Sequence, residues 1–297
     1  VQSIVETFFQ NRSLYTIKVD FIIYMHFLSV ITRYLNEPFL EEFVNYYFSE
    51  GVDHIYVLYD TDSTIPISQK IVDNPNVTIV KSYSFKQRQT LDVNRLYSSI
   101  RDKNEWVLFV DCDEFVSTRK RGDNTIRYEL ETTFCDADCV KVPWVMMSCN
   151  KRSLDPPSIL QHITYRWNHD LRHPHPANWA KGRCRFEQIE VKCFTRCSKF
   201  LQLNLHHPCD KNINLNRIKC VDSIHNTPAT LTPFYSKLRE HNIKEAFMVC
   251  YHYRVFSKQS VERKCLNNKL ENYQPQFMQH LLDSDHADIV DESMKRK

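Results

Sequence analysis

Glycine is scarce in this sequence, with three residues among 297. Glycine-rich loops cradle phosphate groups in many nucleotide-binding proteins, and neither a GxGxxG turn nor a Walker-type loop is present. A nucleotide bound by this chain must therefore be held in another way. An excess of one charge is also lacking, because 39 basic residues face 36 acidic ones. This balance predicts no nucleic-acid partner.

A long hydrophobic run is missing as well. The most apolar stretch, residues 21–31, is interrupted by His26 and is shorter than the ~20 residues that a membrane span needs. We expect a core strand there and no membrane span in this chain. No secretory signal is visible, but the first residue is Val1, which leaves a removed leader or anchor open.

The eleven cysteines form an odd set with irregular spacing. They predict neither a disulfide framework nor a zinc ribbon. Most are interpreted as buried free thiols, which favours a reducing compartment and hence a cytoplasmic location. The alternative is the lumenal domain of a Golgi- or ER-type enzyme whose anchor has been removed.

The first half of the chain alternates short apolar runs with amphipathic helical patterns. Asn36 is expected to cap the first helix, and Gly51 to end it. This alternation is typical of βαβ units, so we predict an α/β fold with a Rossmann-like, mostly parallel sheet flanked by helices. The predicted strands span residues 26–33, 54–60, 77–82 and 106–110, with a second helix over 85–103.

The second half is more strand-rich and irregular. The segments VKVPWVMM, EVKCFTR and KFLQLNL are candidate strands, and the chain becomes helical from Ser257, with a loosely ordered tail after Asp283. We predict a single domain over 1–256, followed by a C-terminal helical segment and tail over 257–297. Within that domain, residues 22–118 form a nucleotide-binding half and 119–256 an acceptor half.

Acidic residues follow two of the predicted strands. Asp60 and Asp62 come after the second strand, and Asp111 and Asp113 come directly after WVLFV. Ligands of open α/β sheets bind beyond the carboxyl ends of the strands, so both pairs should border one crevice. Paired carboxylates on a turn suit a hard cation that keeps open positions for phosphate oxygens. Asp-x-Asp alone is a weak signal, but its position after an apolar strand strengthens it. A Mn²⁺ or Mg²⁺ site is the expectation.

The segment WVLFVDCDEF resembles the Asp-x-Asp-Glu-Phe segment of GT-A glycosyltransferases, most closely the family 92 type and related family 2-like enzymes. The stretch NEPFLEEFVNYYFSEGVDHIYVLYDTDST is also similar to that family, and Gln89 and Asn94 match a Gln and an Asn on its helix before the metal strand. EVKCFTR, LHHP and YHYRVFSKQSVERK resemble its lysine, histidine and His-Tyr segments. The resemblance covers roughly residues 27–264 and implies a GT-A type fold.

The resemblance implies a role for individual residues. Asp111 would contact the ribose or the metal, and Asp113 would ligate the metal. A later histidine would complete the metal site, either His252, which we prefer, or His207. Donor affinity would then fall as the pH drops through ~6.5, where an unperturbed histidine titrates. The residues expected to bind the nucleotide and its diphosphate are Arg33, Asp60, Asp62, Gln89, Asn94, Lys192 and Arg254.

Other assignments have alternatives. Sugar transfer needs a general base to deprotonate the acceptor hydroxyl, and Glu187 is the first candidate and Asp170 the second. Trp144 belongs either to the core, which is favoured, or to an acceptor platform. Cys112, between the two metal-turn carboxylates, is expected to pack against the sheet and to be replaceable.

The predicted function is metal-dependent transfer of a hexose or similar sugar from a nucleotide-diphosphate sugar to a hydroxyl acceptor on a glycan or glycoprotein, with inversion. A sugar nucleotidyltransferase is the nearest rival, although such enzymes usually have a glycine-rich loop where this chain reads TRYLNEPF. A non-catalytic glycan-binding or scaffold protein with a transferase-like fold is the third interpretation. The oligomeric state is not predicted.

Overall fold

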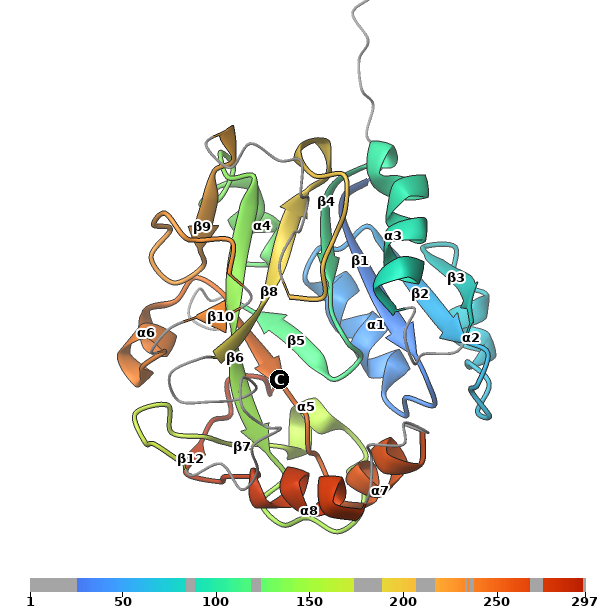
Figure 1. Cartoon of the computed structure of the whole chain (residues 1–297), viewed down its shortest axis with the longest axis vertical. Helices are drawn as coiled ribbons and strands as arrows, with labels where there is room; N and C mark the ends of the chain where they lie inside the picture. Colours follow the sequence, from blue (N-terminus) through green and yellow to red (C-terminus); the bar gives the residue numbers. More distant parts are fainter. Residues whose placement is uncertain are drawn as a thin grey trace, which may run out of the picture.

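The computed structural model describes residues 26–83, 89–118, 124–173, 189–206, 217–232, 234–235, 238–267 and 275–295. Strands and helices alternate through the first half, and strands dominate the second (Figure 1). The strands are β1 (His26–Tyr34), β2 (His54–Asp60), β3 (Val77–Ser82), β4 (Asn104–Phe109), β5 (Glu114–Ser117), β6 (Cys139–Ser148), β7 (Tyr165–Arg166), β8 (Ile189–Arg196), β9 (Cys220–Asp222), β10 (Phe234–Tyr235), β11 (Val249–His252) and β12 (Ile289–Val290). The helices are α1 (Leu40–Ser49), α2 (Gln69–Val72), α3 (Gln89–Ile100), α4 (Ile126–Glu131), α5 (Ile159–His162), α6 (Glu240–Glu245), α7 (Lys258–Asn267) and α8 (Pro275–Asp283), with 3-10 turns η2 (Arg101–Lys103) and η4 (Cys197–Lys199).

Four parallel strands form the sheet of the first half, in the order β3-β2-β1-β4. Ser29 of β1 pairs with His54 on one side and with Val107 on the other. The central strands are nearly continuous apolar runs because both faces of a parallel sheet are covered. The predicted α/β fold, with a mostly parallel sheet flanked by helices, is confirmed and is consistent with a GT-A-like domain.

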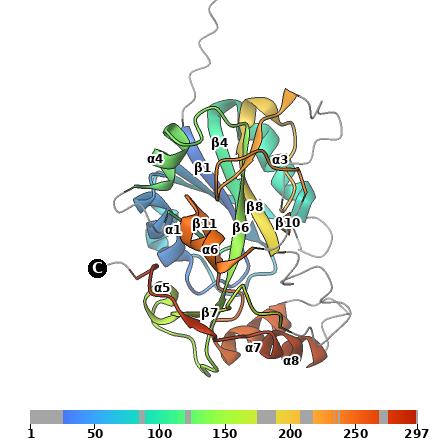
Figure 2. The ribbon, with the colours of Figure 1, turned by 90° about the vertical axis from the view of Figure 1, so that its left-hand side faces the viewer.

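Helices cover both faces of this sheet because successive strand residues point to opposite sides. On one face, Phe43 and Tyr47 of α1 belong to the same buried cluster as Val30. On the other, Tyr97 of α3 belongs to the cluster of Ile31. Figure 2 shows α1 and α3 on opposite sides of β1 and β4.

The turn between β1 and α1 corrects one expectation. Asn36 does not cap α1, whose N-cap residue is Phe39. Asn36 instead has a φ of 58°, a conformation that asparagine adopts more readily than most residues. Its side-chain oxygen accepts hydrogen bonds from the backbone N–H groups of Thr64 at 2.8 Å and Ile65 at 2.9 Å. Asn36 therefore ties the loop after β1 to the loop after β2. Gly51 follows the end of α1, as expected, with a φ of 85°.

The second half extends the sheet with strands of both directions. β8 lies antiparallel between β4 and β6, and β11 pairs with β6 in parallel and with β5 antiparallel. The strand predicted over 199–205 is wrong, because this fully described stretch begins in η4 and continues as irregular backbone. The Asn94 side chain of α3 takes the place of a neighbouring strand there, accepting from the Leu203 N–H at 2.7 Å and donating to the Leu203 carbonyl at 2.8 Å.

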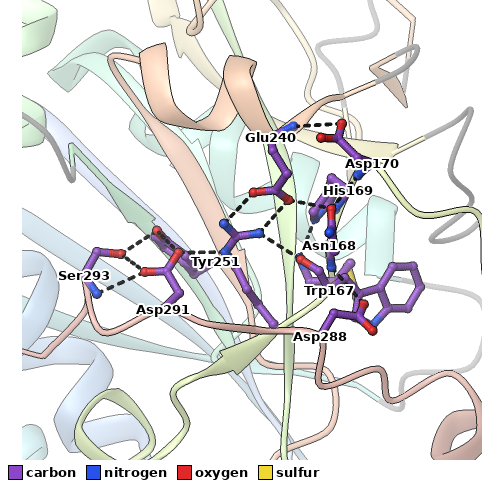
Figure 3. Close-up of polar contacts among 11 residues, drawn as sticks. Trp167, Asn168, His169, Asp170, Glu240, Tyr251, Asp288, Asp291 and Ser293 are labelled. Carbon is purple, nitrogen blue, oxygen red and sulfur yellow. Dashed lines mark hydrogen bonds and ion pairs between the residues drawn. The ribbon is translucent and has the colours of Figure 1, made fainter.

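A buried ion-pair network fastens the C-terminal segment to the body of the protein (Figure 3). Arg166 of β7 makes two parallel 2.7 Å hydrogen bonds to Glu240 of α6 and a third, also 2.7 Å, to Asp291. Asp291 also accepts from Tyr251 of β11 at 3.3 Å, and β12 pairs with β7. The expectation of a loosely ordered tail after Asp283 is therefore wrong for the residues described up to 295.

Candidate functional site

Several of the predicted site residues lie at the sheet edge formed by the carboxyl ends of β1 and β4, which we call the crevice. From β1 the chain continues to β2 and β3 on one side and returns to β4 on the other, so the strand order reverses here. Such a switch point is where open α/β sheets bind ligands, because the loops on either side diverge. Arg33 lies near the end of β1, Asp60 ends β2, and Asp111 follows β4. The structure places all three at this edge of the sheet.

Residues 111–114 form a tight turn between β4 and β5. The Glu114 N–H donates to the Asp111 carbonyl at 3.0 Å, and the Glu114 carboxylate accepts from the Asp111 N–H at 2.8 Å. Between the two aspartates, the buried Cys112 thiol donates to the Arg33 carbonyl at 3.1 Å. The predicted packing of Cys112 against the sheet is confirmed. The turn is thus closed by its own backbone and anchored to β1.

Lys192 of β8 is fully buried beside this turn. Its ammonium nitrogen lies 2.9 Å from Glu114 Oε2 and 3.2 Å from Asp111 Oδ2. Burial lowers the pKa of Lys192, but the charges of Asp111 and Glu114 outweigh it and raise the pKa above its ordinary value. The side chain is therefore charged and has no exposed surface, whereas the Asp111 side chain is 42% exposed. A ligand in the crevice can therefore contact Asp111 directly, whereas Lys192 acts on it only electrostatically, from behind Asp111.

Strand β11 carries His252 to the same turn from far along the chain. In the pairing of β11 with β5, His252 lies opposite Glu114, and the Tyr253 N–H donates to the Asp113 carbonyl at 2.8 Å. His252 Nε2 lies 3.7 Å from Asp113 Oδ1. The Trp144 ring packs against the imidazole, with centroids 4.2 Å apart. The structure thus brings together Asp113 and the histidine that we preferred.

The electrostatic environment of His252 keeps its imidazole neutral. Burial lowers the pKa of His252 well below its ordinary value, and the positive charges of Lys264 and Arg254 lower it further. Among the described residues, His252 Nδ1 has no hydrogen-bond partner. A neutral imidazole is the form that binds a metal. Protonation of His252, and any loss of metal binding that follows from it, is therefore expected at a lower pH than the ~6.5 of an unperturbed histidine.

Two residues that the sequence reasoning did not select complete the crevice. Lys264 of α7 forms an ion pair with Asp113 and donates to the Arg254 carbonyl at 2.8 Å. Glu37, after β1, has its pKa raised to about 7 by burial and by the negative charge of Asp113, against the opposing charge of Lys264. Their signal was present, because both lie in segments that carry the resemblance, NEPFLEEF and SVERK.

Arg33 and Asp60 form a buried ion pair across the ends of β1 and β2. Burial lowers the pKa of Arg33, and the charges of Asp60 and Asp111 oppose that effect. Asp60 also accepts from the Asp62 N–H at 2.9 Å, so its carboxylate shapes the turn after β2. The exposed Asp62 follows on that turn. A ligand at this edge would meet the pair as a preformed, largely neutral unit.

The remaining nucleotide and acceptor candidates make contacts with other parts of the protein. Asn94 uses its amide to hold the Leu203 backbone, and Gln89 is the first described residue of α3. Trp144 is 5% exposed and belongs to the hydrophobic core cluster, which favours the core interpretation over an acceptor platform. Arg254 follows β11, and its carbonyl is the acceptor for Lys264.

The two candidate bases are not brought to the crevice by any described contact. The Asp170 carboxylate accepts from the Glu240 N–H at 3.3 Å and lies 3.8 Å from Arg239, beside the ion-pair network of Figure 3. Glu187 lies outside the described residues, as does His207, the alternative metal ligand. Asp170 thus helps to join the segment after β7 to α6, and a base role for either residue stays a prediction.

The donor atoms of the crevice fit a divalent cation in part. Asp113 and His252 present a carboxylate oxygen and a neutral imidazole nitrogen 3.7 Å apart. The Asp111 carboxylate is paired with Lys192 through Oδ2, and its role as a metal ligand stays a prediction. Within the part of the chain that the structure describes, no group of three or more His, Cys, Asp or Glu side chains is placed to hold a metal. Two protein ligands suit a cation of the Mg²⁺ type that takes its other ligands from phosphates and water.

In the described ranges nine cysteines are free thiols, and seven of them are buried, as expected. Across the same residues, the helices are too short or too polar to traverse a lipid bilayer.

Comparison with known proteins does not identify a family. No protein-family model and no curated protein matches the chain. Among solved structures, TarS 1–349 from S. aureus is 13% identical, with 86% of this chain and 70% of that chain covered and a TM-score of 0.38. Its complex with UDP-GlcNAc is 16% identical, with coverages of 87% and 73% and a TM-score of 0.35. HddC from Yersinia pseudotuberculosis is 12% identical, with coverages of 75% and 98% and a TM-score of 0.35. Sequence identities and TM-scores this low do not indicate a shared function, and the family 92 resemblance stays a prediction.

Proposed function

We propose that this protein is a glycosyltransferase that takes a sugar from a nucleotide-diphosphate donor and passes it to a hydroxyl acceptor. The observation that supports this best is the convergence of Asp111, Asp113 and His252 at the switch point of the sheet. The pairing of β11 with β5 and the turn after β4 create that convergence. It brings together two separate segments that each resemble glycosyltransferases, WVLFVDCDEF and YHYRVFSKQSVERK.

The proposed donor site spans the crevice from the ends of β1 and β2 to the metal turn. Arg33 and Asp60 would border the base and ribose, and the exposed Asp111 carboxylate lies on the same turn as Asp113. A divalent cation, Mn²⁺ or Mg²⁺, would be held by Asp113 and His252, and its chemistry would be to neutralise charge that builds on the departing diphosphate. Burial keeps His252 in the neutral form that this role requires.

Around that position, the chain's own cations set the local charge. Lys264 contacts Asp113, and Lys192 holds Asp111 in the turn while remaining out of solvent. A leaving diphosphate gains negative charge, so nearby fixed positive charge stabilises the transition state more than the ground state. Inversion at the anomeric carbon, the identity of the sugar and the choice of a hydroxyl on a glycan or glycoprotein belong to this proposal as expectations. A cytoplasmic location is proposed on the free thiols.

The test is metal-dependent donor binding. Nucleotide sugars would be screened with Mn²⁺ by thermal shift, where a ligand at 100 times its dissociation constant adds ~2.7 kcal/mol of stability. Asp113→Asn keeps the shape of the side chain and removes its charge, so the Mn²⁺-dependent shift should disappear while the unliganded protein stays folded. Asp102→Asn, at an exposed carboxylate on η2, is the matched control and should behave as the wild type.

Turnover assays then separate the transferase from its rivals. Hydrolysis of the donor without acceptor, dependent on Asp113, supports the transferase. Release of pyrophosphate from a nucleoside triphosphate and a sugar phosphate would indicate a nucleotidyltransferase instead. An Asp113→Asn protein that turns over donor at the wild-type rate would remove the metal turn from the proposal, and complete inactivity with every donor would favour a scaffold.

A further inference from the structure

One carboxylate oxygen of Asp113, the proposed metal ligand, is already paired with a lysine of the protein itself. The Lys264 ammonium forms an ion pair with Asp113 Oδ2, while His252 Nε2 faces Asp113 Oδ1 at 3.7 Å. The same ammonium donates to the Arg254 carbonyl at 2.8 Å. The Asp113 side chain is 12% exposed and that of Lys264 22%, so little water screens the contact.

The position of Lys264 follows from how α7 is anchored. The helix begins with reciprocal hydrogen bonds between two serines, in which the Ser260 N–H donates to Ser257 Oγ at 2.8 Å and the Ser257 N–H to Ser260 Oγ at 3.2 Å. Val261, on the first turn, is fully buried against Cys149 and other apolar side chains. A rigid helix start thus delivers a long, flexible amine to Asp113. Only the lysine side chain itself has to move for the contact to break.

A divalent ion bound to Asp113 would stand within a few ångströms of this ammonium. Like charges at that separation repel strongly where solvent is excluded. Asp113 also has a limited set of lone pairs, and the ammonium uses some of them. The ion and Lys264 therefore oppose each other at Asp113, although each would face a different carboxylate oxygen.

We propose that Lys264 is a tethered cation that competes with the divalent metal for Asp113, and that the donor's diphosphate resolves the competition. This inference rests on the proposed function, because it takes the Asp113–His252 pair as the metal site. A diphosphate supplies oxygen ligands to the metal and an alternative anionic partner for the lysine. Binding of metal and of nucleotide is then mutually reinforcing, since a coupling between two ligands acts equally in both directions. Without nucleotide, the protein holds metal weakly.

The experiment measures Mn²⁺ affinity by electron paramagnetic resonance of the free ion, with and without UDP or GDP as diphosphate probes. Lys264→Met removes the competing charge, and Lys264→Gln keeps a donor for the Arg254 carbonyl in case the methionine variant folds poorly. Without nucleotide, both variants should bind Mn²⁺ at least tenfold more tightly than the wild type. The gain in affinity caused by the nucleotide should shrink by a similar factor. Lys258→Met, at an exposed lysine on the same helix, is the control and should leave both affinities unchanged.

Each result decides the matter. An affinity of Lys264→Gln within twofold of the wild type, in a folded protein whose Mn²⁺ binding is abolished by Asp113→Asn, overturns the competition but leaves the metal site standing. Absence of Mn²⁺ binding in every variant, with and without nucleotide, overturns both the competition and the metal part of the proposed function. Competition without turnover of any nucleotide sugar upholds the role of Lys264 and counts against the transferase.

Discussion

Removal of the Arg166 side chain should destabilise the fold more than any comparable surface change. Arg166 is almost fully buried, and its guanidinium satisfies two carboxylates, those of Glu240 and Asp291, as well as the Trp167 carbonyl at 2.8 Å. Arg166→Met preserves much of the apolar stem but deletes the charge. Two buried carboxylates then face each other without their shared cation.

The expected cost follows from this arrangement. Breaking a buried ion pair by removing one partner typically costs about 3–5 kcal/mol, because the remaining charge is left desolvated. Glu240 and Asp291 retain other donors, the His169 N–H at 2.7 Å and the Ser293 N–H at 3.0 Å, which prevents a larger loss. We therefore expect a decrease of about 3–5 kcal/mol in the free energy of unfolding at pH 7.

The assay is urea unfolding followed by circular dichroism, with Arg127→Met as the control. Arg127 makes contacts of the same length, 2.7 Å to Asp53 and 2.8 Å to Glu131, but its side chain is 34% exposed. Exposed pairs contribute about 0–1 kcal/mol each, so the control should lose far less stability.

The pH dependence provides a second check. In the wild type, burial raises the pKa of Glu240, but hydrogen bonds and the charge of Arg166 outweigh it and hold the pKa below its ordinary value. That stabilisation is present above the unfolded-state pKa and is lost as the pH falls. In Arg166→Met the Glu240 carboxylate becomes neutral more readily, so the stability deficit of this variant should shrink between pH 7 and pH 5. Equal losses for Arg166→Met and Arg127→Met, or a deficit that grows at pH 5, would refute this reasoning.

Three further predictions concern single side chains. Cys112→Ala removes a buried thiol and its bond to a carbonyl and should cost about 1 kcal/mol in urea unfolding while donor affinity stays within twofold. Burial lowers the pKa of His169 to about 3, so stability should fall as the pH drops below the unfolded value of ~6.5, by about 2 kcal/mol at pH 5. His169→Phe should lack that component of the pH dependence, which parallel melts at pH 7 and pH 5 would reveal. Because the pKa of His252 lies well below 6.5, calorimetric donor affinity should not change between pH 7 and pH 6 through this residue, and a transition near 6.5 that His252→Ala abolishes would contradict its burial.

The parallel sheet of the first half was predictable because each of its strands can be recognised from its own short stretch of sequence. The runs at β2 and β3 were placed correctly to the residue, since strands buried on both faces appear as continuous apolar segments. The turn at Asp111 was predictable for the same reason, because it follows the β4 run directly. Asn36 was misread because a positive φ and a bond to the loop after β2 are not visible in local sequence.

The rest of the site depends on contacts between distant segments. Glu114 and Lys192 meet only because β8 packs beside β4, and His252 reaches Asp113 only because β11 inserts between β5 and β6. Periodicity indicates that such strands exist but not which neighbours they take. The ordered tail was missed in the same way, because the partner of Asp291 is an arginine on β7.

Ion pairs already engage the main carboxylates of the crevice before any ligand arrives. Three carboxylates at the strand ends are paired with a cation, in Arg33–Asp60, Lys192–Asp111 and Lys264–Asp113, and Lys192 is shared with Glu114. A bare diphosphate would add negative charge beside these carboxylates, and a bare divalent ion would compete with an ammonium for Asp113. When the two bind together, their charges largely cancel. The metal gives the diphosphate a cationic partner, and the diphosphate gives an anionic partner to the ammonium that the metal displaces. If the proposed function holds, the same ion pairs that stabilise the empty crevice make it selective for a metal and a diphosphate that enter together.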